Sequence, residues 1–193
     1  MSRAEGSRGF SLAELLVALG VASALAIAGV TATATALRVL LGAGARLEAT
    51  DLAWLAEESF MFAVRRAGFD PRATGIDAIA EATSARLALH ADLDGDGTVD
   101  ASSAEATTFA CDVPGRRLSR IVGAQSLPLA STVVACAFIY RDADGTALVP
   151  PPSGLDAAAR RRVRRITLDA AVEPADGGPP ARATMAVALR GEP

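Results

Sequence analysis

The chain has 193 residues, of which 51% are hydrophobic and only 4% aromatic, and its formal net charge at neutral pH is −3. This length suits one folded domain together with a membrane segment, and the scarcity of aromatic residues predicts a core built mostly from Ala, Val and Leu. The mild acidic balance excludes general nucleic-acid binding through net charge alone.

The first segment of the chain combines a short basic stretch, a lone acid and a long apolar run. The basic stretch ends at Gly9, Phe10 follows, and Glu14 stands four residues later. No residue of 15–37 is charged, which meets the roughly 20 residues that a helix needs to cross a bilayer. An acid at the start of such a run is expensive in lipid and therefore indicates a function. The Arg residues before the run predict a cytoplasmic N-terminus.

The octet GFSLAELL, which starts at Gly9, resembles the prepilin signal of the type IV pilin superfamily of pilins, minor pilins and type II secretion pseudopilins. The resemblance implies that residues 1–9 are a leader, which a prepilin peptidase removes after Gly9. It also implies that the new amino terminus, Phe10, is N-methylated and that Glu14 acts in assembly. Residues 10–36 would then lie in the inner membrane and, after assembly, in the filament core.

An ordinary secretory signal peptide, or a plain membrane anchor, is the alternative interpretation of this segment. Small-residue sites that a signal peptidase cuts do occur, at residues 32–34 and 34–36. A secretory signal has a shorter apolar core, however, and it leaves Glu14 unexplained.

One long helix is predicted over residues 10–67, because no Pro precedes Pro71 and Gly68 gives a C-terminal signal. Gly20 and Gly29 weaken it locally. The resemblance makes them candidate positions for loosening on assembly, and close helix packing is the alternative. Two apolar stripes follow the membrane segment. They consist of Leu40, Leu47, Trp54 and Met61, and of Leu41, Ala45, Ala49, Leu52, Ala56 and Phe60.

Beyond the helix, residues 68–193 are predicted to form a β-rich head. The fold class is therefore α+β, with the long N-terminal helix packed on an antiparallel sheet of about five or six strands, as in the pilin fold. The strands are predicted at residues 85–90, 106–111, 117–122, 133–140, 164–172 and 183–189.

The head resembles PilW-type minor pilins and the J-type pseudopilins of type II secretion. The resemblance rests on Phe138–Tyr140, on Asp144–Thr146 before a Pro-rich loop, and on Val163–Leu168. It implies a minor pilin that is assembled into a type IV pilus or primes one. A type II secretion pseudopilin and a DNA-uptake (competence) pilin are alternatives, and a monomeric membrane-anchored binding protein is another.

Two cysteines, Cys111 and Cys136, are predicted to pair in an oxidising compartment outside the inner membrane. In the chain-entropy treatment, a disulfide that closes this loop stabilises the folded state by about 3.5 kcal/mol. The alternative is two unpaired buried thiols, because Cys136 lies inside an apolar run.

An acidic stretch follows the spacing of a calcium-binding loop, in which Ca²⁺ takes six to eight oxygen ligands. Gly97 stands at its sixth position, but its twelfth is Ser103, so a bidentate ligand has to come from elsewhere, with Glu105 as the candidate. An acidic turn between two strands is the alternative, and no other cofactor is expected. The predicted ligands are Asp92, Asp94, Asp96, Thr98 and Asp100.

Five Arg residues occupy six positions from Arg160 to Arg165. They could meet DNA phosphates or an acidic neighbouring subunit. The solvated start of a strand is the preferred interpretation, because single-strand binders interleave aromatic residues and none occurs here. Nucleic acid is therefore not an expected partner.

No catalytic set is visible: His90 is the single His, and neither a phosphate loop nor a zinc-ligand cluster occurs. We therefore expect a substrate of the prepilin peptidase and not an enzyme. The expected partners are this peptidase, other pilins or pseudopilins through the N-terminal helix, and the bacterial inner membrane. The N-terminus would be cytoplasmic and the head periplasmic, at the cell surface after assembly.

Overall fold

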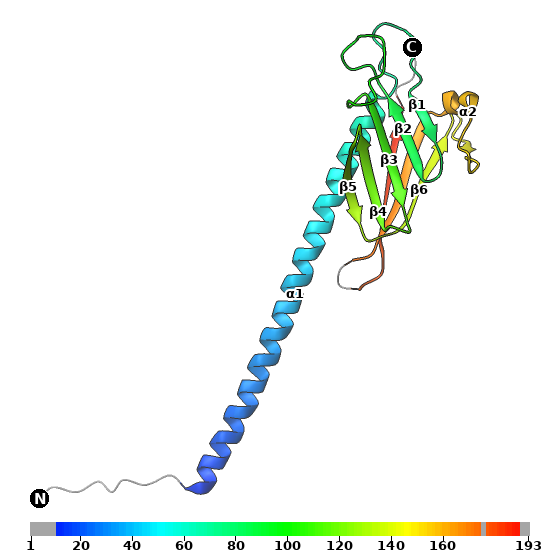
Figure 1. Ribbon diagram of the computed structural model, residues 1–193. Helices are drawn as coiled ribbons and strands as arrows, with labels where there is room; N and C mark the ends of the chain where they lie inside the picture. The colour runs from blue at the N-terminus through cyan, green and yellow to red at the C-terminus, as the bar shows by residue number, and fades with distance from the viewer. Residues whose placement is uncertain (1–10, 175–176, 190–193) are drawn as a thin grey trace, which may run out of the picture. The chain divides into compact units, whose positions relative to one another are not determined.

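A computed structural model describes the backbone of residues 11–174 and 177–189, and the side chains of these residues apart from 37–55. The chain divides into two compact units, Met1–Gly44 and Ala45–Pro193. The fold class is α+β, as predicted, with helices and antiparallel strands (Figure 1). The elements are α1 (Leu12–Arg66), β1 (Ile79–Ala82), β2 (Arg86–His90), β3 (Ala106–Asp112), β4 (Arg117–Val122), β5 (Gln125–Ser131), β6 (Val133–Arg141), β7 (Ala147–Leu148), α2 (Ala157–Arg162), β8 (Arg165–Val172) and β9 (Ala181–Ala188).

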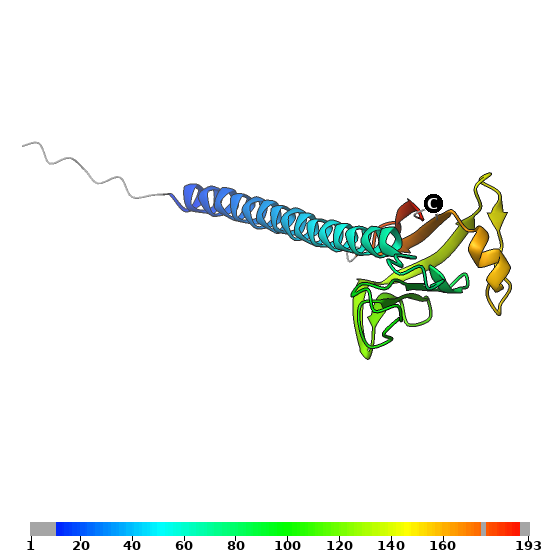
Figure 2. The same cartoon turned by 90° about the horizontal axis from the view of Figure 1, so that it is seen from above.

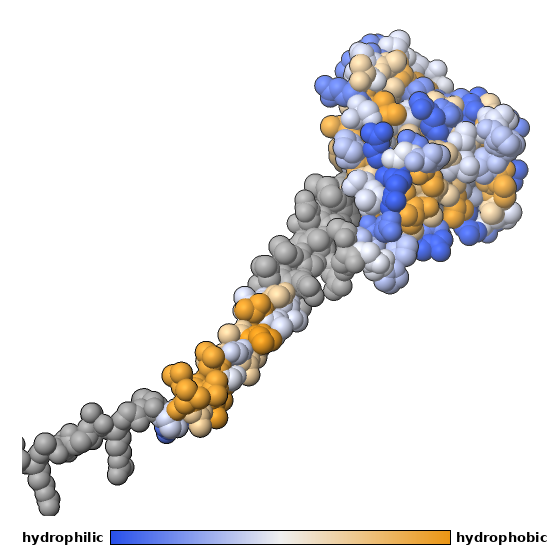
Figure 3. Space-filling model, turned by 60° about the horizontal axis from the view of Figure 1, so that its bottom comes forward, coloured by the Kyte–Doolittle hydropathy of each residue, from blue (hydrophilic) through white to orange (hydrophobic). Residues whose placement is uncertain are grey.

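The first unit contains an apolar stretch of α1, Leu12–Ala36, whose 25 residues are long and apolar enough to span a membrane. Its side chains are exposed throughout, and Figure 3 shows the apolar surface that results. The four hydroxyl groups in this stretch donate to carbonyls of the preceding turn. This is how a helix satisfies Ser and Thr side chains where water is absent. The four residues are Ser23, Thr31, Thr33 and Thr35.

In the second unit, the last turns of α1 pack against the strands through residues spaced three or four apart. Ala56, Phe60 and Val64 are buried. The Phe60 ring makes an edge contact with Phe109 of β3 at 5.3 Å between centroids, and stacks on Phe138 of β6 at 6.3 Å. Phe60 therefore contacts a strand from each of two sheets, and the predicted packing of the helix on the head is confirmed.

Of the two predicted stripes on α1, the described members are Ala56 and Phe60, which are buried, and Met61, which is half-buried. The remaining stripe residues lie outside the described side chains. The helix ends close to the predicted position, because Gly68 adopts a φ of 75° and its N–H bonds the carbonyl of His90. An added Cβ at Gly68 would lie 3.0 Å from the Cβ of Ala78.

The head contains two antiparallel sheets, which corrects the prediction of one sheet with five or six strands. The first sheet has the order β1-β2-β3-β4-β5 and the second β7-β6-β8-β9. The six predicted strands form near their predicted bounds. The chain leaves the first sheet between β5 and β6, where Thr132 has a φ of 58°. Figure 2 shows the strands of both sheets beside the end of α1.

Three strands and one helix were not predicted, each for a physical reason. β5 contains Pro128, which a strand tolerates when it lies at a sheet edge, as β5 does. β1 has the sequence IAEA, which has little β character by itself, and β7 spans two residues. The helix α2 has six residues and begins at Ala157, after the N-cap residue Asp156, whose carboxylate accepts a hydrogen bond from the backbone N–H of Ala159 at 2.7 Å.

Candidate functional site

The predicted cleavage and methylation sites, Gly9 and Phe10, lie outside the described residues. The first described residue beside them is Ser11, which caps α1. Its hydroxyl accepts a hydrogen bond from the backbone N–H of Glu14, and the Glu14 carboxylate accepts one from the backbone N–H of Ser11, both at 3.2 Å. This reciprocal pair is a capping box, formed by the pattern Ser-x-x-Glu.

The capping box gives Glu14 a local role that the sequence interpretation missed, although the Ser-x-x-Glu spacing was there to find. The capping box therefore explains Glu14 even if the helix is only a membrane anchor. The Glu14 carboxylate is exposed in the first turn of α1, just before the uncharged run of residues 15–37, and it has a second oxygen for a further partner. Capping and assembly are thus compatible roles for Glu14, and an experiment has to separate them.

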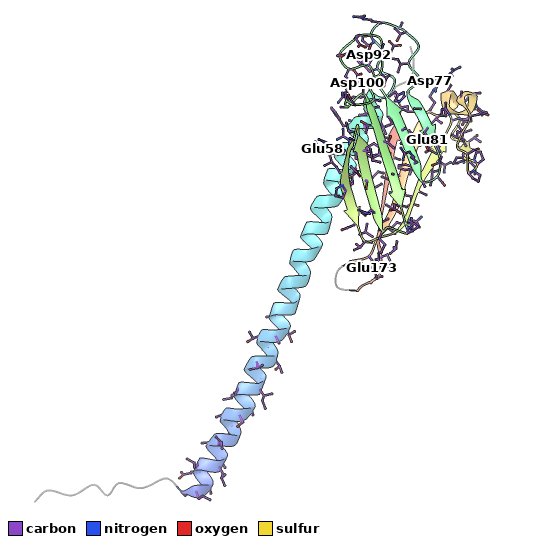
Figure 4. The ribbon with its side chains drawn as sticks, in the orientation of Figure 1. Glu58, Asp77, Glu81, Asp92, Asp100 and Glu173 are labelled. Carbon is purple, nitrogen blue, oxygen red and sulfur yellow. A yellow bond between two sulfur atoms is a disulfide. The ribbon has the colours of Figure 1, made fainter. Side chains whose placement is uncertain are left out.

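The acidic loop between β2 and β3 winds around the buried carboxylate of Asp92. Asp92 has no exposed surface, and its two oxygens accept hydrogen bonds from the N–H groups of Gly95 (2.7 Å), Asp96 (3.1 Å) and Gly97 (2.9 Å). Gly95 and Gly97 have φ values of 75° and 90°, which Gly adopts without strain. Figure 4 shows Asp92 and Asp100 at one end of the head.

Three of the predicted ligands come together in this loop. Carboxylate oxygens of Asp92, Asp94 and Asp96 lie within 4.8 Å of one another, which leaves room for one cation among them. Asp100 is directed elsewhere, because its carboxylate accepts bonds from the N–H and hydroxyl of Ser102 at 2.8 Å. The hydroxyl of Thr98 donates to Asp96 at 2.8 Å.

Glu105 is buried under the acidic loop and holds its backbone. One carboxylate oxygen accepts the N–H groups of Leu93 (2.7 Å) and Asp94 (3.2 Å), and the other accepts that of Asp100 (2.8 Å). These bonds, that of Asp100 first, hold the pKa of Glu105 below its ordinary value. Both oxygens of Glu105 thus serve the loop's backbone, as those of Asp92 also do. The carboxylates that lie close enough together to share a cation are those of Asp92, Asp94 and Asp96.

No model of a protein family matches this chain, and a search of curated proteins finds none that is similar to it.

Cys111 of β3 and Cys136 of β6 form a disulfide, with Cα atoms 5.7 Å apart, and the predicted pairing is confirmed. The two strands belong to different sheets. The disulfide therefore links the two sheets of the head and closes a loop between residues 25 positions apart in the sequence. The expected stabilisation of the folded state, about 3.5 kcal/mol, refers to this loop.

The Arg-rich stretch is mostly engaged within the head. Arg160–Arg162 form the end of α2, which was not predicted, and Arg165 is the first residue of β8, so the predicted solvated start of a strand holds for the last part of the stretch. Arg161 pairs with Asp77 at 3.0 Å, and Arg162 pairs with Asp142 at 3.1 Å. Arg160 and Arg164 donate to backbone carbonyls. Cations at the C-terminal end of a helix are favourable, so this stretch has a structural explanation.

His90 ends β2 beside the acidic loop and is half-buried. Burial lowers the pKa of the imidazole, and the carboxylate of Asp77 opposes that shift. Its side chain lines a small cavity together with Glu105 and Arg120. The expectation that the chain is not an enzyme stays a prediction.

Proposed function

We propose that this protein is a minor pilin, which is cleaved after Gly9, methylated at Phe10 and assembled into, or used to prime, a type IV pilus. The observation that carries the proposal is the order of Gly9, Phe10 and Glu14 directly before an uncharged run, residues 15–37, in a helical stretch long and apolar enough to span a membrane. The same helix continues into a β-rich head, in which Phe60 fixes its last turns.

In this function Glu14 acts as a register device. The helix enters the inner membrane with its N-terminus in the cytoplasm, and the head lies in the periplasm. An uncompensated carboxylate in a low-dielectric environment costs several kcal/mol, and a well-placed cation recovers that cost. The cation is the amino terminus of Phe10 on a neighbouring subunit, so only the correct axial stagger pairs both charges.

Mass spectrometry of the full-length protein, purified from a cell that contains a prepilin peptidase, tests the proposal. The expected mass lacks residues 1–9 and carries one methyl group on Phe10. A matched Gly9→Leu variant should keep its leader, because the peptidase cuts after Gly. Recovery of the native chain with its nine leader residues attached would overturn the proposal, and cleavage at residues 32–36 would favour a secretory signal.

A type II secretion pseudopilin is the alternative function, since it needs the same N-terminal features. A deletion strain separates the two: loss of pili with normal secretion supports the minor pilin, and loss of secretion with normal pili supports the pseudopilin. The Arg-rich stretch does not favour a DNA-uptake pilin over a minor pilin. Ion pairs and contacts with backbone carbonyls within the head already engage its side chains, those of Arg160, Arg161, Arg162 and Arg164.

The acidic loop stays a predicted calcium site within this function. Carboxylates of Asp92, Asp94 and Asp96 supply part of the oxygen set that Ca²⁺ prefers. A bound cation would relieve the repulsion among these three groups, and water would complete its coordination.

A further inference from the structure

Three consecutive prolines follow β7 and form an exposed segment of the head. The segment, Val149–Pro152, connects β7 to the turn that precedes α2. Val149 is 83% exposed, more than any other large hydrophobic side chain in the described part of the chain. Pro151 and Pro152 are also exposed, and Pro150 is half-buried. We call these four residues the proline ridge; it carries no charge, and all its side chains are apolar.

The backbone of the proline ridge is restricted by its own covalent structure. Each proline ring fixes φ near about −65°, and a residue that precedes a proline is confined to extended or polyproline II conformations. Val149, Pro150 and Pro151 each precede a proline, so all three are held close to polyproline II. The N–H of Gly154 donates to the carbonyl of Pro151 at 2.8 Å. Pro152 therefore takes the second position of a β-turn, which proline favours.

Both ends of the proline ridge are fixed to the head. At its start, Leu148 pairs with Tyr140 of β6. At its end, Leu155 is buried, and its N–H donates to the carbonyl of Ala82 at the end of β1, at 2.8 Å. Gly154 has a φ of 87°, and an added Cβ there would lie 3.1 Å from the same carbonyl oxygen. The ridge is thus a projection with little conformational freedom to lose when a partner binds it.

The proline ridge presents proline rings and free carbonyl groups to a partner. The carbonyls of Val149 and Pro150 accept no hydrogen bond from any residue that the structure describes. Two charges that flank the ridge in the sequence, Asp142 and Arg162, neutralise each other in an ion pair at 3.1 Å. A partner therefore gains more from the rings and the carbonyls than from charge.

The proline ridge is accessible on the head. Figures 1 and 2 show α2, and the segment that leads into it, on the side of the head away from the last turns of α1. A partner can therefore contact the ridge without displacing the packing of Phe60 between the two sheets.

We propose that the proline ridge is a recognition segment for another protein, whose binding groove is lined by aromatic side chains. Grooves of this kind bind polyproline II segments, because the proline rings pack on aromatic rings and the unpaired carbonyls accept hydrogen bonds from Trp or Tyr. The three restricted residues span about 9 Å, so the groove is short. The proposal goes beyond the proposed function, because it uses the head alone and does not depend on cleavage after Gly9.

Site-specific photocrosslinking of the full chain in its native cell tests the proposal. The photoreactive amino acid p-benzoylphenylalanine replaces Val149 in one variant and Val113 in the matched control. Val113 is also exposed and also precedes a proline, Pro114, but no second proline follows it. Position 149 should give a product with one other protein, at least tenfold more than position 113. Mass spectrometry should place the link on a partner peptide that contains Trp or Tyr.

Competition and substitution then test the conformation of the proline ridge. A proline decapeptide, added to isolated cell envelopes before irradiation, should reduce the product of position 149 at least tenfold, whereas a glycine-serine decapeptide should not. The double substitution Pro150→Ala, Pro151→Ala frees the backbone and should reduce it as much, whereas Pro114→Ala should not. Circular dichroism of each purified variant confirms that the head is folded.

Equal products from positions 149 and 113, or a product that the proline decapeptide does not reduce, would overturn the proposal. A link to a lipid, or to a second copy of the chain, would also overturn it. These outcomes are independent of the leader. Cleavage after Gly9 without a crosslink would reject the proline ridge and leave the proposed function standing, whereas a crosslink from an uncleaved chain would do the reverse.

Discussion

The side chain of Tyr140 shows how one residue can join two parts of the head. It is fully buried on β6, in the second sheet, and its hydroxyl donates to the carbonyl of Thr83 at 2.7 Å. Thr83 lies in the connection between β1 and β2 of the first sheet. Burial raises the pKa of the Tyr140 hydroxyl well above its ordinary value, because the phenolate would lose its hydration.

Because Tyr140 is the single Tyr of the chain, alkaline titration of phenol absorbance reports on this residue alone. A group with a raised pKa contributes stability below the pKa of the unfolded state, near 10, and loses it as the pH rises. We expect phenolate absorbance to appear only together with unfolding, above about pH 10. Circular dichroism of the same samples follows unfolding, and Tyr140→Phe provides the blank. A phenolate that forms near pH 10 in folded protein would contradict the burial of this hydroxyl.

At the scale of elements, the loop between β2 and β3 depends on carboxylates that act as hydrogen-bond acceptors. The pKa of Glu105 is lowered by the backbone N–H of Asp100 and then by that of Leu93. The pKa of Asp96 is lowered chiefly by Thr98, and that of Asp100 by Ser102. The ionised forms therefore stabilise the folded loop.

Acid is expected to destabilise the head through Glu105. A carboxyl with a lowered pKa contributes stability above its unfolded pKa, near 4, and loses it as the pH falls through the folded value. The melting temperature of wild type should fall between about pH 5 and pH 3, and Glu105→Gln should be less stable at pH 7 but depend less on pH in that window. Glu57→Gln, at an exposed position, is the control for calorimetry and should follow wild type. Parallel pH curves for wild type and Glu105→Gln would contradict this role.

Calcium is the second expectation for the same loop. With a dissociation constant of roughly 0.1 mM, as in extracellular modules, 10 mM Ca²⁺ would stabilise the folded chain by about 2.7 kcal/mol. Calorimetry should show a rise in melting temperature with Ca²⁺ that chelator reverses. The double variant Asp94→Asn, Asp96→Asn removes two ligands but leaves Asp92 in place, and its melting temperature should not respond. No response of wild type at 10 mM Ca²⁺ would favour a plain acidic turn.

At the scale of the whole molecule, assembly separates the two roles of Glu14. Gln at this position can still accept the N–H of Ser11 and complete the capping box, but it cannot pair with an amino terminus. If the charge sets the register, we expect Glu14→Gln and Glu14→Ala to be processed and inserted alike but incorporated into filaments at least tenfold less than wild type. Quantitative immunoblotting of sheared filaments measures this. Normal incorporation of Glu14→Gln would leave capping as the role of this side chain.

Much of the fold could be predicted because local pattern determines it. The uncharged run after Glu14 predicts a membrane-length helix, and Gly68 marks its end, because both depend on neighbours along the chain. The same holds for alternating strands such as β8, in which Ile166, Leu168 and Ala170 are buried. Strands without such a pattern, such as β5 with Pro128, were missed, because their place at a sheet edge is a property of the pairing.

What the sequence by itself determined is the order of Gly9, Phe10 and Glu14 before the apolar run, the helix, most strands, the pair of cysteines and the spacing of acids in the loop. Only the tertiary structure decided that the strands form two sheets, that Glu105 serves the loop's backbone while Asp100 turns away, and that α2 engages its Arg residues. The reason is physical: helices and strands follow periodicity along the chain, whereas partners of buried polar groups come from residues distant in sequence, and packing alone brings them together.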